Sequence, residues 1–218
     1  MIDSRAARLN MVESQLRTNK VTDEAVLNAF LAVPRERFVP PDLAGIAYVD
    51  DDVPLGGGRV LLEPMVLARL LQLAQPRAKD KVLEIGAATG YATALLARLA
   101  ERVVALECDA RLAAAARARL KQIGGDRVTL VEGPLERGHP AAAPYDVILV
   151  NGAVATIPDA VAQQLAEGGR LVTVIQPPQG MGQGVLMTRV EGRLSQRPAF
   201  DAATALLAGF RPAPAFVF

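Results

Sequence analysis

The chain is poor in the side chains that hold metals or form disulfides. Its 218 residues include one cysteine, Cys108, one histidine, His139, and no tryptophan. A single cysteine excludes a disulfide within the chain, and one cysteine with one histidine are too few ligands for a structural zinc site. We therefore expect no metal centre. The acidic run at 50–52 is interpreted as a solvated turn rather than as a set of metal ligands.

Long apolar runs and a strong excess of one charge are also absent. No stretch reaches roughly 18 uninterrupted apolar residues, the length that spans a bilayer. The charged stretch 1–17 has no apolar segment typical of a secretory signal. The formal net charge is +1, without the basic excess of a general nucleic-acid-binding protein. These features predict a cytoplasmic protein whose partners are neither membranes nor nucleic acids.

The sequence does contain short apolar runs that alternate with helical patterns from residue 81 onward. Hydrophobic residues make up 51% of the chain, which is enough for a sizeable core. Strands are expected at 82–85, 103–106, 128–131, 147–150 and 171–175, and helices at 91–99, 110–123 and 158–165. Such alternation predicts an α/β fold with a doubly wound, mostly parallel sheet. Antiparallel edge strands are expected from 185–190 and from the C-terminal tail.

The first third of the chain has a different pattern. Apolar positions at helical spacing before residue 32 predict a helical cap, which Pro34, Pro40 and Pro41 interrupt. Residues 47–64 are acidic and then glycine-rich, typical of a long functional loop with a short extended stretch, and a helix is expected at 65–73. We assign 1–75 to a cap and substrate-side loop and 76–218 to a cofactor-binding core, both within one domain.

The turn after the first core strand is the strongest chemical signal. Glu84 precedes Gly86-Ala87-Ala88-Thr89-Gly90, and Glu107 ends the next apolar run. The spacing is GxxxG rather than the GxGxxG of dinucleotide sites. The Glu84 carboxylate would repel a pyrophosphate but attract an ammonium group, and Glu107 could accept hydrogen bonds from ribose hydroxyls. The turn therefore favours S-adenosylmethionine over NAD, with an ordinary strand–turn–helix as the alternative.

Other candidate positions follow the neighbouring strands. An adenine could pack at Gly133, Pro134 and Leu135, although a plain turn explains them as well. Asn151 could contact the methionine part or the substrate, or simply form an Asn-Gly turn. Cys108 is interpreted as a packing residue beside the cofactor rather than as a nucleophile.

Three further side chains receive expectations of their own. His139 lies in a proline- and alanine-containing loop and is expected to be exposed. Arg35 and Arg37 could bind a substrate carboxylate, but structural salt bridges are the default expectation.

Taken together, these segments resemble the protein-L-isoaspartate O-methyltransferase family. The resemblance covers most of the chain and includes VPRERFVP at 33–40, AYVDDDVPLG at 47–56, VLEIGAATGYATALLA at 82–97, YDVI at 145–148 and QLAEGGRLV at 164–172. It implies the Rossmann-like fold of S-adenosylmethionine-dependent methyltransferases and methylation of the free carboxylate of isoaspartyl residues in proteins. It places cofactor contacts on Glu84, Gly86, Ala88, Gly90 and Glu107, with Gly133 to Leu135 along the adenine pocket.

The chain departs from the family pattern on the substrate side. The family typically has Gly-Gln-Thr-Ile-Ser before the proline, and its serine lies at the substrate carboxylate. Here the segment is Gly58-Arg59-Val60-Leu61-Leu62-Glu63-Pro64, so the serine position is Leu62. Leucine offers no hydrogen bond, and Glu63 would repel a carboxylate. The cofactor side departs less: Ala88 replaces a glycine, and Pro134 replaces an acid.

Two functions from different classes remain open on the sequence. The first is methyl transfer to an isoaspartyl carboxylate, which needs no general base because a carboxylate is already a nucleophile; Arg59 would then supply the counter-charge for the acceptor. The second is a relative that binds S-adenosylmethionine but has lost or changed its substrate. The apolar tail at 209–218 could pack over the site or in a subunit interface.

Overall fold

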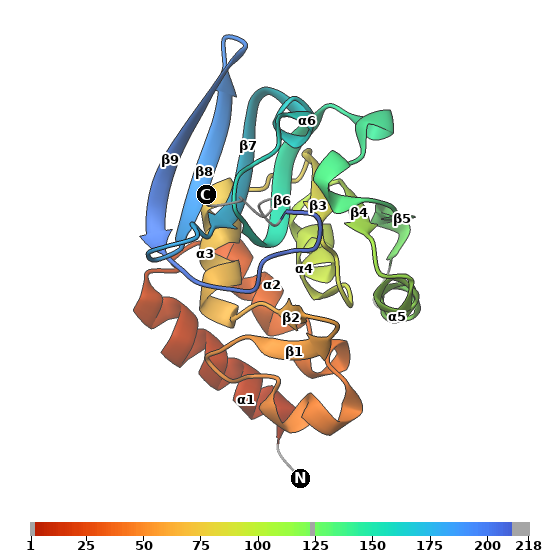
Figure 1. Ribbon diagram of the computed structural model, residues 1–218. Helices are drawn as coiled ribbons and strands as arrows, with labels where there is room; N and C mark the ends of the chain where they lie inside the picture. The colour runs from red at the N-terminus through yellow and green to blue at the C-terminus, as the bar shows by residue number, and fades with distance from the viewer. Residues whose placement is uncertain (1–2, 123–124, 211–218) are drawn as a thin grey trace, which may run out of the picture.

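The computed structural model describes residues 3–122 and 125–210. A seven-stranded sheet in the order β5-β4-β3-β6-β7-β8-β9 forms the centre of the molecule (Figure 1). The strands from β5 to β7 pair in parallel, and β8 and β9 pair antiparallel to their neighbours. The doubly wound, mostly parallel sheet that the sequence predicted is thus confirmed.

The elements have the following bounds. The helices are α1 Ser4–Met11, α2 Glu24–Ala32, α3 Pro64–Ala74, α4 Tyr91–Leu99, α5 Ala110–Lys121 and α6 Asp159–Ala162. The strands are β1 Val53–Gly56, β2 Arg59–Leu61, β3 Lys81–Ile85, β4 Arg102–Glu107, β5 Val128–Glu132, β6 Tyr145–Val154, β7 Leu165–Ile175, β8 Gln183–Val190 and β9 Arg193–Asp201. A short π-helix spans Val12–Leu16, and 3-10 helices span Arg17–Asn19, Arg35–Phe38 and Pro41–Ile46.

The largest difference from the sequence prediction lies at 158–165. The expected helix is only the four residues of α6, and β7 begins at Leu165 and runs through Gly168 and Gly169. The chain leaves the helix because Leu165 pairs with Tyr145 of β6, whose N–H donates to the Gln164 carbonyl at 2.9 Å. Sheet pairing, a tertiary contact, overrides the local helical composition here.

Two smaller differences concern the predicted extended segments. The stretch expected inside the loop 47–64 is an antiparallel hairpin of β1 and β2, separate from the main sheet. The second edge strand, β9, precedes the C-terminal tail rather than arising from it. Most of the tail, 211–218, lies outside the described residues, so its predicted packing has no structural description.

The core fills both faces of the sheet. Val82 of β3 belongs to a cluster that extends through α3, α4 and the N-terminal cap, whereas Leu83 and Ile85 belong to a second cluster on the other face. Successive side chains of a strand point to opposite faces, so a strand buried on both sides needs a continuous apolar run. On the cap side, the rings of Phe30 and Phe38 meet Tyr91 edge-on, with centroids 6.0 and 5.4 Å from it.

Residues 202–210, which we call the C-terminal strap, return from β9 toward β6 (Figure 1, dark blue). The Leu207 N–H donates to the Ala153 carbonyl at 2.9 Å, and the Ala153 N–H donates to the Ala205 carbonyl at 3.1 Å. The Thr204 hydroxyl donates to the Asp52 carboxylate at 2.5 Å. The strap therefore joins the carboxyl end of β6 to the loop before β1.

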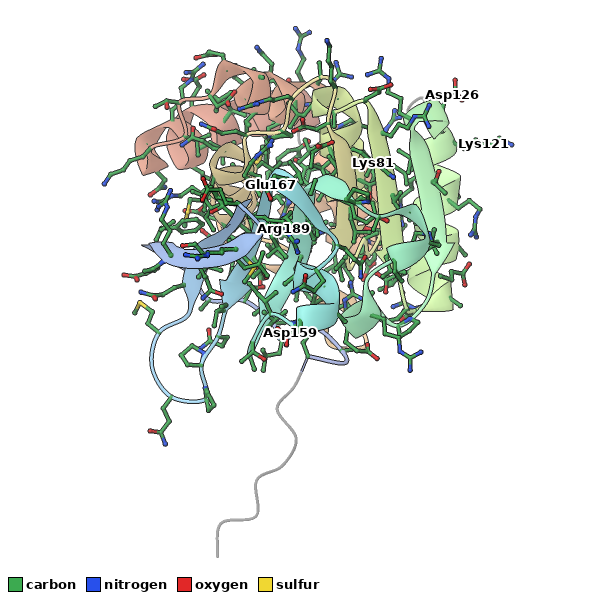
Figure 2. The ribbon with its side chains drawn as sticks, turned by 90° about the horizontal axis from the view of Figure 1, so that it is seen from above. Lys81, Lys121, Asp126, Asp159, Glu167 and Arg189 are labelled. Carbon is green, nitrogen blue, oxygen red and sulfur yellow. The ribbon has the colours of Figure 1, made fainter. Side chains whose placement is uncertain are left out.

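Charged side chains lie around the outside of the molecule. Figure 2 shows Lys121 and Asp126 at its outer edge, near the end of α5.

Within residues 3–122 and 125–210, no helix is long and apolar enough to cross a membrane. The same residues contain no group of three or more histidine, cysteine, aspartate or glutamate side chains suited to a metal ion.

Candidate active site

The glycine-rich turn links β3 to α4 at the carboxyl edge of the sheet. The N–H groups of Gly86 and Ala87 donate to the Leu106 carbonyl of β4, at 2.8 and 3.0 Å. Gly86 and Gly90 have φ of +88° and +92°, and Ala88 has φ of +51°. A Cβ added at Gly86 would lie 3.3 Å from the Arg59 guanidinium and from the Leu207 methyl groups. Both the conformation and the close approach therefore require glycine at 86.

Glu107, at the end of β4, is fully buried and richly hydrogen-bonded. Its Oε1 accepts from the N–H groups of Cys108 and Asp109, at 2.9 and 3.0 Å, and its Oε2 accepts from the Ala88 N–H at 2.6 Å. Arg59 donates Nη1 to Oε1 at 2.6 Å and Nη2 to Oε2 at 3.0 Å. Burial raises the pKa of Glu107, but the Arg59 guanidinium and the backbone donors outweigh it, so the pKa lies below its usual value.

Glu84, at the end of β3, has a different environment. It is fully buried, and it accepts hydrogen bonds from the Thr93 hydroxyl at 2.5 Å and from Asn151 Nδ2 at 2.9 Å. Burial raises its pKa to about 7, against these two hydrogen bonds, which lower it. Asn151 is 9% exposed, and its Oδ1 has no partner among the described residues. A buried amide oxygen without a hydrogen-bond donor costs free energy. A ligand ammonium group would supply that donor, so the oxygen fits such a ligand.

The substrate side centres on Leu62, between β2 and α3. The Leu62 side chain is 2% exposed and packs in the core, while its carbonyl accepts from Arg35 Nη2 at 2.7 Å. Arg35 also donates Nε to the Ala47 carbonyl at 2.6 Å, and its guanidinium lies 5.0 Å from the Tyr91 ring centre. The expectation of a salt bridge for Arg35 is wrong: its described partners are carbonyls and an aromatic ring.

The acidic run beside this segment is only partly solvated. Asp50 and Asp51 are exposed, but Asp52 accepts from the Glu63 N–H at 2.7 Å and from Thr204 of the strap. Burial, followed by the nearby charges of Asp50 and Asp52, raises the pKa of Glu63 to about 7. Glu63 therefore repels a carboxylate less at neutral pH than its sequence position predicted.

Of the remaining predicted positions, Gly133 and Cys108 lie beside Glu107, whereas His139 lies beside Gln164 and Tyr145. Gly133 follows β5 and donates its N–H to the Glu107 carbonyl at 3.0 Å, Pro134 is exposed, and Leu135 is 1% exposed in the core. The Cys108 side chain is exposed, so it does not pack as the sequence predicted. The expectation that His139 is exposed is also wrong, because it is half-buried.

Sequence reasoning missed three residues that shape this site. Thr93 supports Glu84 from the first turn of α4, Leu207 packs on the glycine-rich turn, and Thr204 ties the strap to Asp52. Thr93 carries no local motif, and the two strap residues come from a segment more than 100 positions away from the turn. Only the tertiary fold brings them together.

The fold and the site define a class of protein. A doubly wound sheet, a GxxxG turn and two buried glutamates at the ends of neighbouring strands form the nucleoside crevice of an S-adenosylmethionine-dependent methyltransferase. Among the described residues, the Asn151 Oδ1 that lacks a hydrogen-bond donor fits the ammonium group of that cofactor.

Comparison with known proteins gives the family. Residues 7–200 match the model of the protein-L-isoaspartate(D-aspartate) O-methyltransferase family. A protein-L-isoaspartate O-methyltransferase of Methylorubrum extorquens (strain PA1) is 45% identical over 195 residues, covering 89% of this chain and 85% of that protein. The chain belongs to this family. The family, the S-adenosylmethionine-dependent activity and the isoaspartyl function predicted from the sequence are thereby confirmed.

Solved structures agree with this assignment. A protein-L-isoaspartate O-methyltransferase structure superposes with a TM-score of 0.80 at 26% identity, covering 93% of this chain and 66% of that longer chain. A Plasmodium falciparum structure, described as a putative protein-L-isoaspartate O-methyltransferase in complex with S-adenosylhomocysteine, has a TM-score of 0.77 at 18% identity, covering 95% of this chain and 99% of that one. The second likeness supports the fold alone.

Proposed function

We propose the following roles for this chain's residues in methyl transfer to an isoaspartyl carboxylate. Glu107 accepts hydrogen bonds from the cofactor's ribose hydroxyls, and the turn 86–90 lies against the cofactor. The observation that carries the proposal is the pair of buried carboxylates, Glu84 and Glu107, on either side of that turn. When bound, S-adenosylmethionine supplies a methyl group on a sulfonium, which is already a good leaving group.

The cofactor's amino end would be held at the ends of β3 and β6. Asn151 Oδ1 is buried and has no donor within residues 3–122 and 125–210, so it is available to an ammonium group, while Asn151 Nδ2 stays on Glu84. Glu84 adds a negative charge when it is ionised. Gly133 and Pro134 would line the adenine, whereas the burial of Leu135 makes it a support beneath them. Ala88 contributes its N–H to Glu107, and Cys108 does the same.

The acceptor would bind between the hairpin of β1 and β2 and the start of α3, on the side that the cap at 1–75 provides. A carboxylate needs no general base, so the residues act by positioning it and excluding water, which can lower a barrier by about 7–11 kcal/mol. The Leu62 side chain contributes packing and offers no hydrogen bond, and Arg59 is the counter-charge that we assign to the acceptor. The macromolecules that supply the acceptor carboxylate are proteins with isoaspartyl damage. The cytoplasmic location of this chain stays a prediction.

The test compares two substitutions at the serine position. Leu62→Ala and Leu62→Ser leave nearly the same cavity, and each should destabilise the fold by about 2–5 kcal/mol. Only the serine restores a hydroxyl, and a hydrogen bond to a charged group is worth about 1.5–3 kcal/mol. We expect kcat/KM on an isoaspartyl peptide to be roughly tenfold higher for Leu62→Ser than for Leu62→Ala.

The matching aspartyl peptide is the control substrate. The wild-type chain should methylate the isoaspartyl peptide and leave the aspartyl peptide unmodified. Equal kcat/KM values for the two variants would place the acceptor carboxylate away from Leu62. Cofactor binding without transfer to the isoaspartyl peptide would contradict the proposed acceptor site.

A further inference from the structure

Arg59 lies where the cofactor's ribose is proposed to bind. It belongs to β2, its side chain is 6% exposed, and it forms a two-pronged ion pair with Glu107. The same guanidinium lies over the glycine-rich turn, 3.3 Å from the position of a Cβ at Gly86. The cofactor-binding acid and the substrate-side hairpin are thus in direct contact.

Glu107 has no lone pair to spare for a further donor. A carboxylate offers about four lone-pair sites, and Glu107 accepts two N–H groups from Arg59 and one each from Ala88, Cys108 and Asp109. The three backbone donors are fixed by the turn and by the end of β4. Arg59 is the donor that can leave by a side-chain rotation, so a ribose diol must displace it.

We infer that Arg59 is a gate that competes with the cofactor's ribose for Glu107 and, once displaced, pairs with the acceptor carboxylate. The inference rests on the proposed role of Glu107. A buried guanidinium that loses its carboxylate needs another anion, because an unpaired buried charge is costly. Arg59 begins β2, and Leu62 directly follows that strand, so the acceptor carboxylate proposed to bind beside Leu62 is the anion that the reaction itself supplies.

The gate makes cofactor and acceptor binding cooperative. The cofactor frees the guanidinium for the acceptor, and by linkage an acceptor carboxylate that holds Arg59 exposes Glu107 to the cofactor. The hairpin has room at its tip, because Gly58 has φ of +73° and a Cβ added there would meet nothing within 4 Å.

The test is calorimetric titration of S-adenosylhomocysteine into wild type, Arg59→Gln and Arg59→Lys. If Arg59 covers Glu107 in nine molecules of ten, its removal lowers Kd roughly tenfold. Lysine keeps the charge but loses the two-pronged geometry, so it should give a smaller gain. Arg117→Gln removes an exposed positive charge of α5 that is paired with Glu132 of β5, and its Kd should match that of wild type.

A second titration measures cooperativity. In wild type, a saturating isoaspartyl peptide should lower the Kd for S-adenosylhomocysteine by several-fold, and this effect should vanish in Arg59→Gln. An unchanged or weaker affinity in Arg59→Gln would overturn the gate. Glu107→Gln separates the two hypotheses. If it binds S-adenosylhomocysteine as wild type does, the ribose assignment itself fails. If it binds weakly while Arg59→Gln binds no better than wild type, the ribose assignment is supported and the gate alone is overturned.

Discussion

At the scale of single residues, two buried glutamates have opposite protonation tendencies. Glu107 faces a guanidinium and three backbone N–H groups, which keep its pKa low. In the part of the chain that the structure describes, Glu84 has two neutral donors and no cation in hydrogen-bond contact, and burial raises its pKa to about 7. The difference follows from the partners, because both side chains are equally hidden from water.

The raised pKa of Glu84 makes the free energy of unfolding depend on pH. The folded-state pKa of about 7 lies above the ordinary value of 4.5, a difference worth about 3 kcal/mol. Glu84 thus contributes stability that is fully present below pH 4.5 and is lost as pH rises through about 7. Glu84→Gln does not titrate, so we expect its stability relative to wild type to rise by about 3 kcal/mol between pH 4.5 and 8.

Urea denaturation at a series of pH values measures this difference. Glu101→Gln, at an exposed position, removes one negative charge elsewhere and serves as the control. If the stabilities of Glu84→Gln and wild type change in parallel across the range, then folding does not raise the pKa of Glu84.

The sequence predicts part of this site for a physical reason. The carboxyl ends of parallel strands meet at one edge of a sheet, so Glu84, Glu107 and Asn151 were expected to converge there. The partner of Arg59 was not predictable, because a separate hairpin brings it onto the turn. The state of Glu63 depends likewise on burial and on neighbouring charges that only the fold defines.

At the scale of elements, the C-terminal strap packs on the carboxyl edge of the sheet, where the glycine-rich turn lies. Leu207 packs against Gly86 at the end of β3 and against Gly152 within β6. A Cβ at Gly152 would lie 2.6 Å from Leu207 Cγ, closer than ordinary packing allows. The strap can therefore pack this closely only because glycines stand at the contact points beside two neighbouring strands. Sequence patterns place the strands well because apolar runs mark them, but no pattern marks an irregular segment that packs on glycines.

We expect Gly152→Ala to displace the strap. The variant should lose about 2–3 kcal/mol of stability through the clash and the backbone conformation, whose φ is +154°. Leu207→Ala alone should lose about 2–4 kcal/mol through a cavity. In the double variant the clash is gone, so its loss should be smaller than the sum of the single losses by about 1 kcal/mol or more.

Thermal and urea denaturation of the four proteins measure this coupling. Gly192→Ala is the matched control, because Gly192 also has a positive φ, +73°, but a Cβ there meets nothing within 4 Å. Additive losses in the double variant would show that the effect at Gly152 comes from the backbone conformation rather than from contact with Leu207.

At the scale of the whole molecule, the cap and the sheet share one core. A single buried cluster includes Leu16 and Phe30 of the cap together with Val82 of β3 and Tyr91 of α4. The Thr89 hydroxyl of the glycine-rich turn donates to the Phe38 carbonyl at 2.5 Å. The cap therefore contacts and supports the glycine-rich turn. We propose that 1–75 and 76–218 unfold as one unit.

Hydrogen exchange followed by mass spectrometry tests this cooperativity, with α2 reporting on the cap and β3 on the sheet. The slowest amides of both elements should open with the same free energy, within about 1 kcal/mol. Phe30→Ala removes a fully buried ring that meets Tyr91, at a cost of about 3–5 kcal/mol. In one cooperative unit this loss appears equally in α2 and β3, although the substitution lies only in α2. A loss confined to α2 would mean that the cap opens on its own, and the turn beneath Arg59 and Glu107 would then keep its fold without the cap.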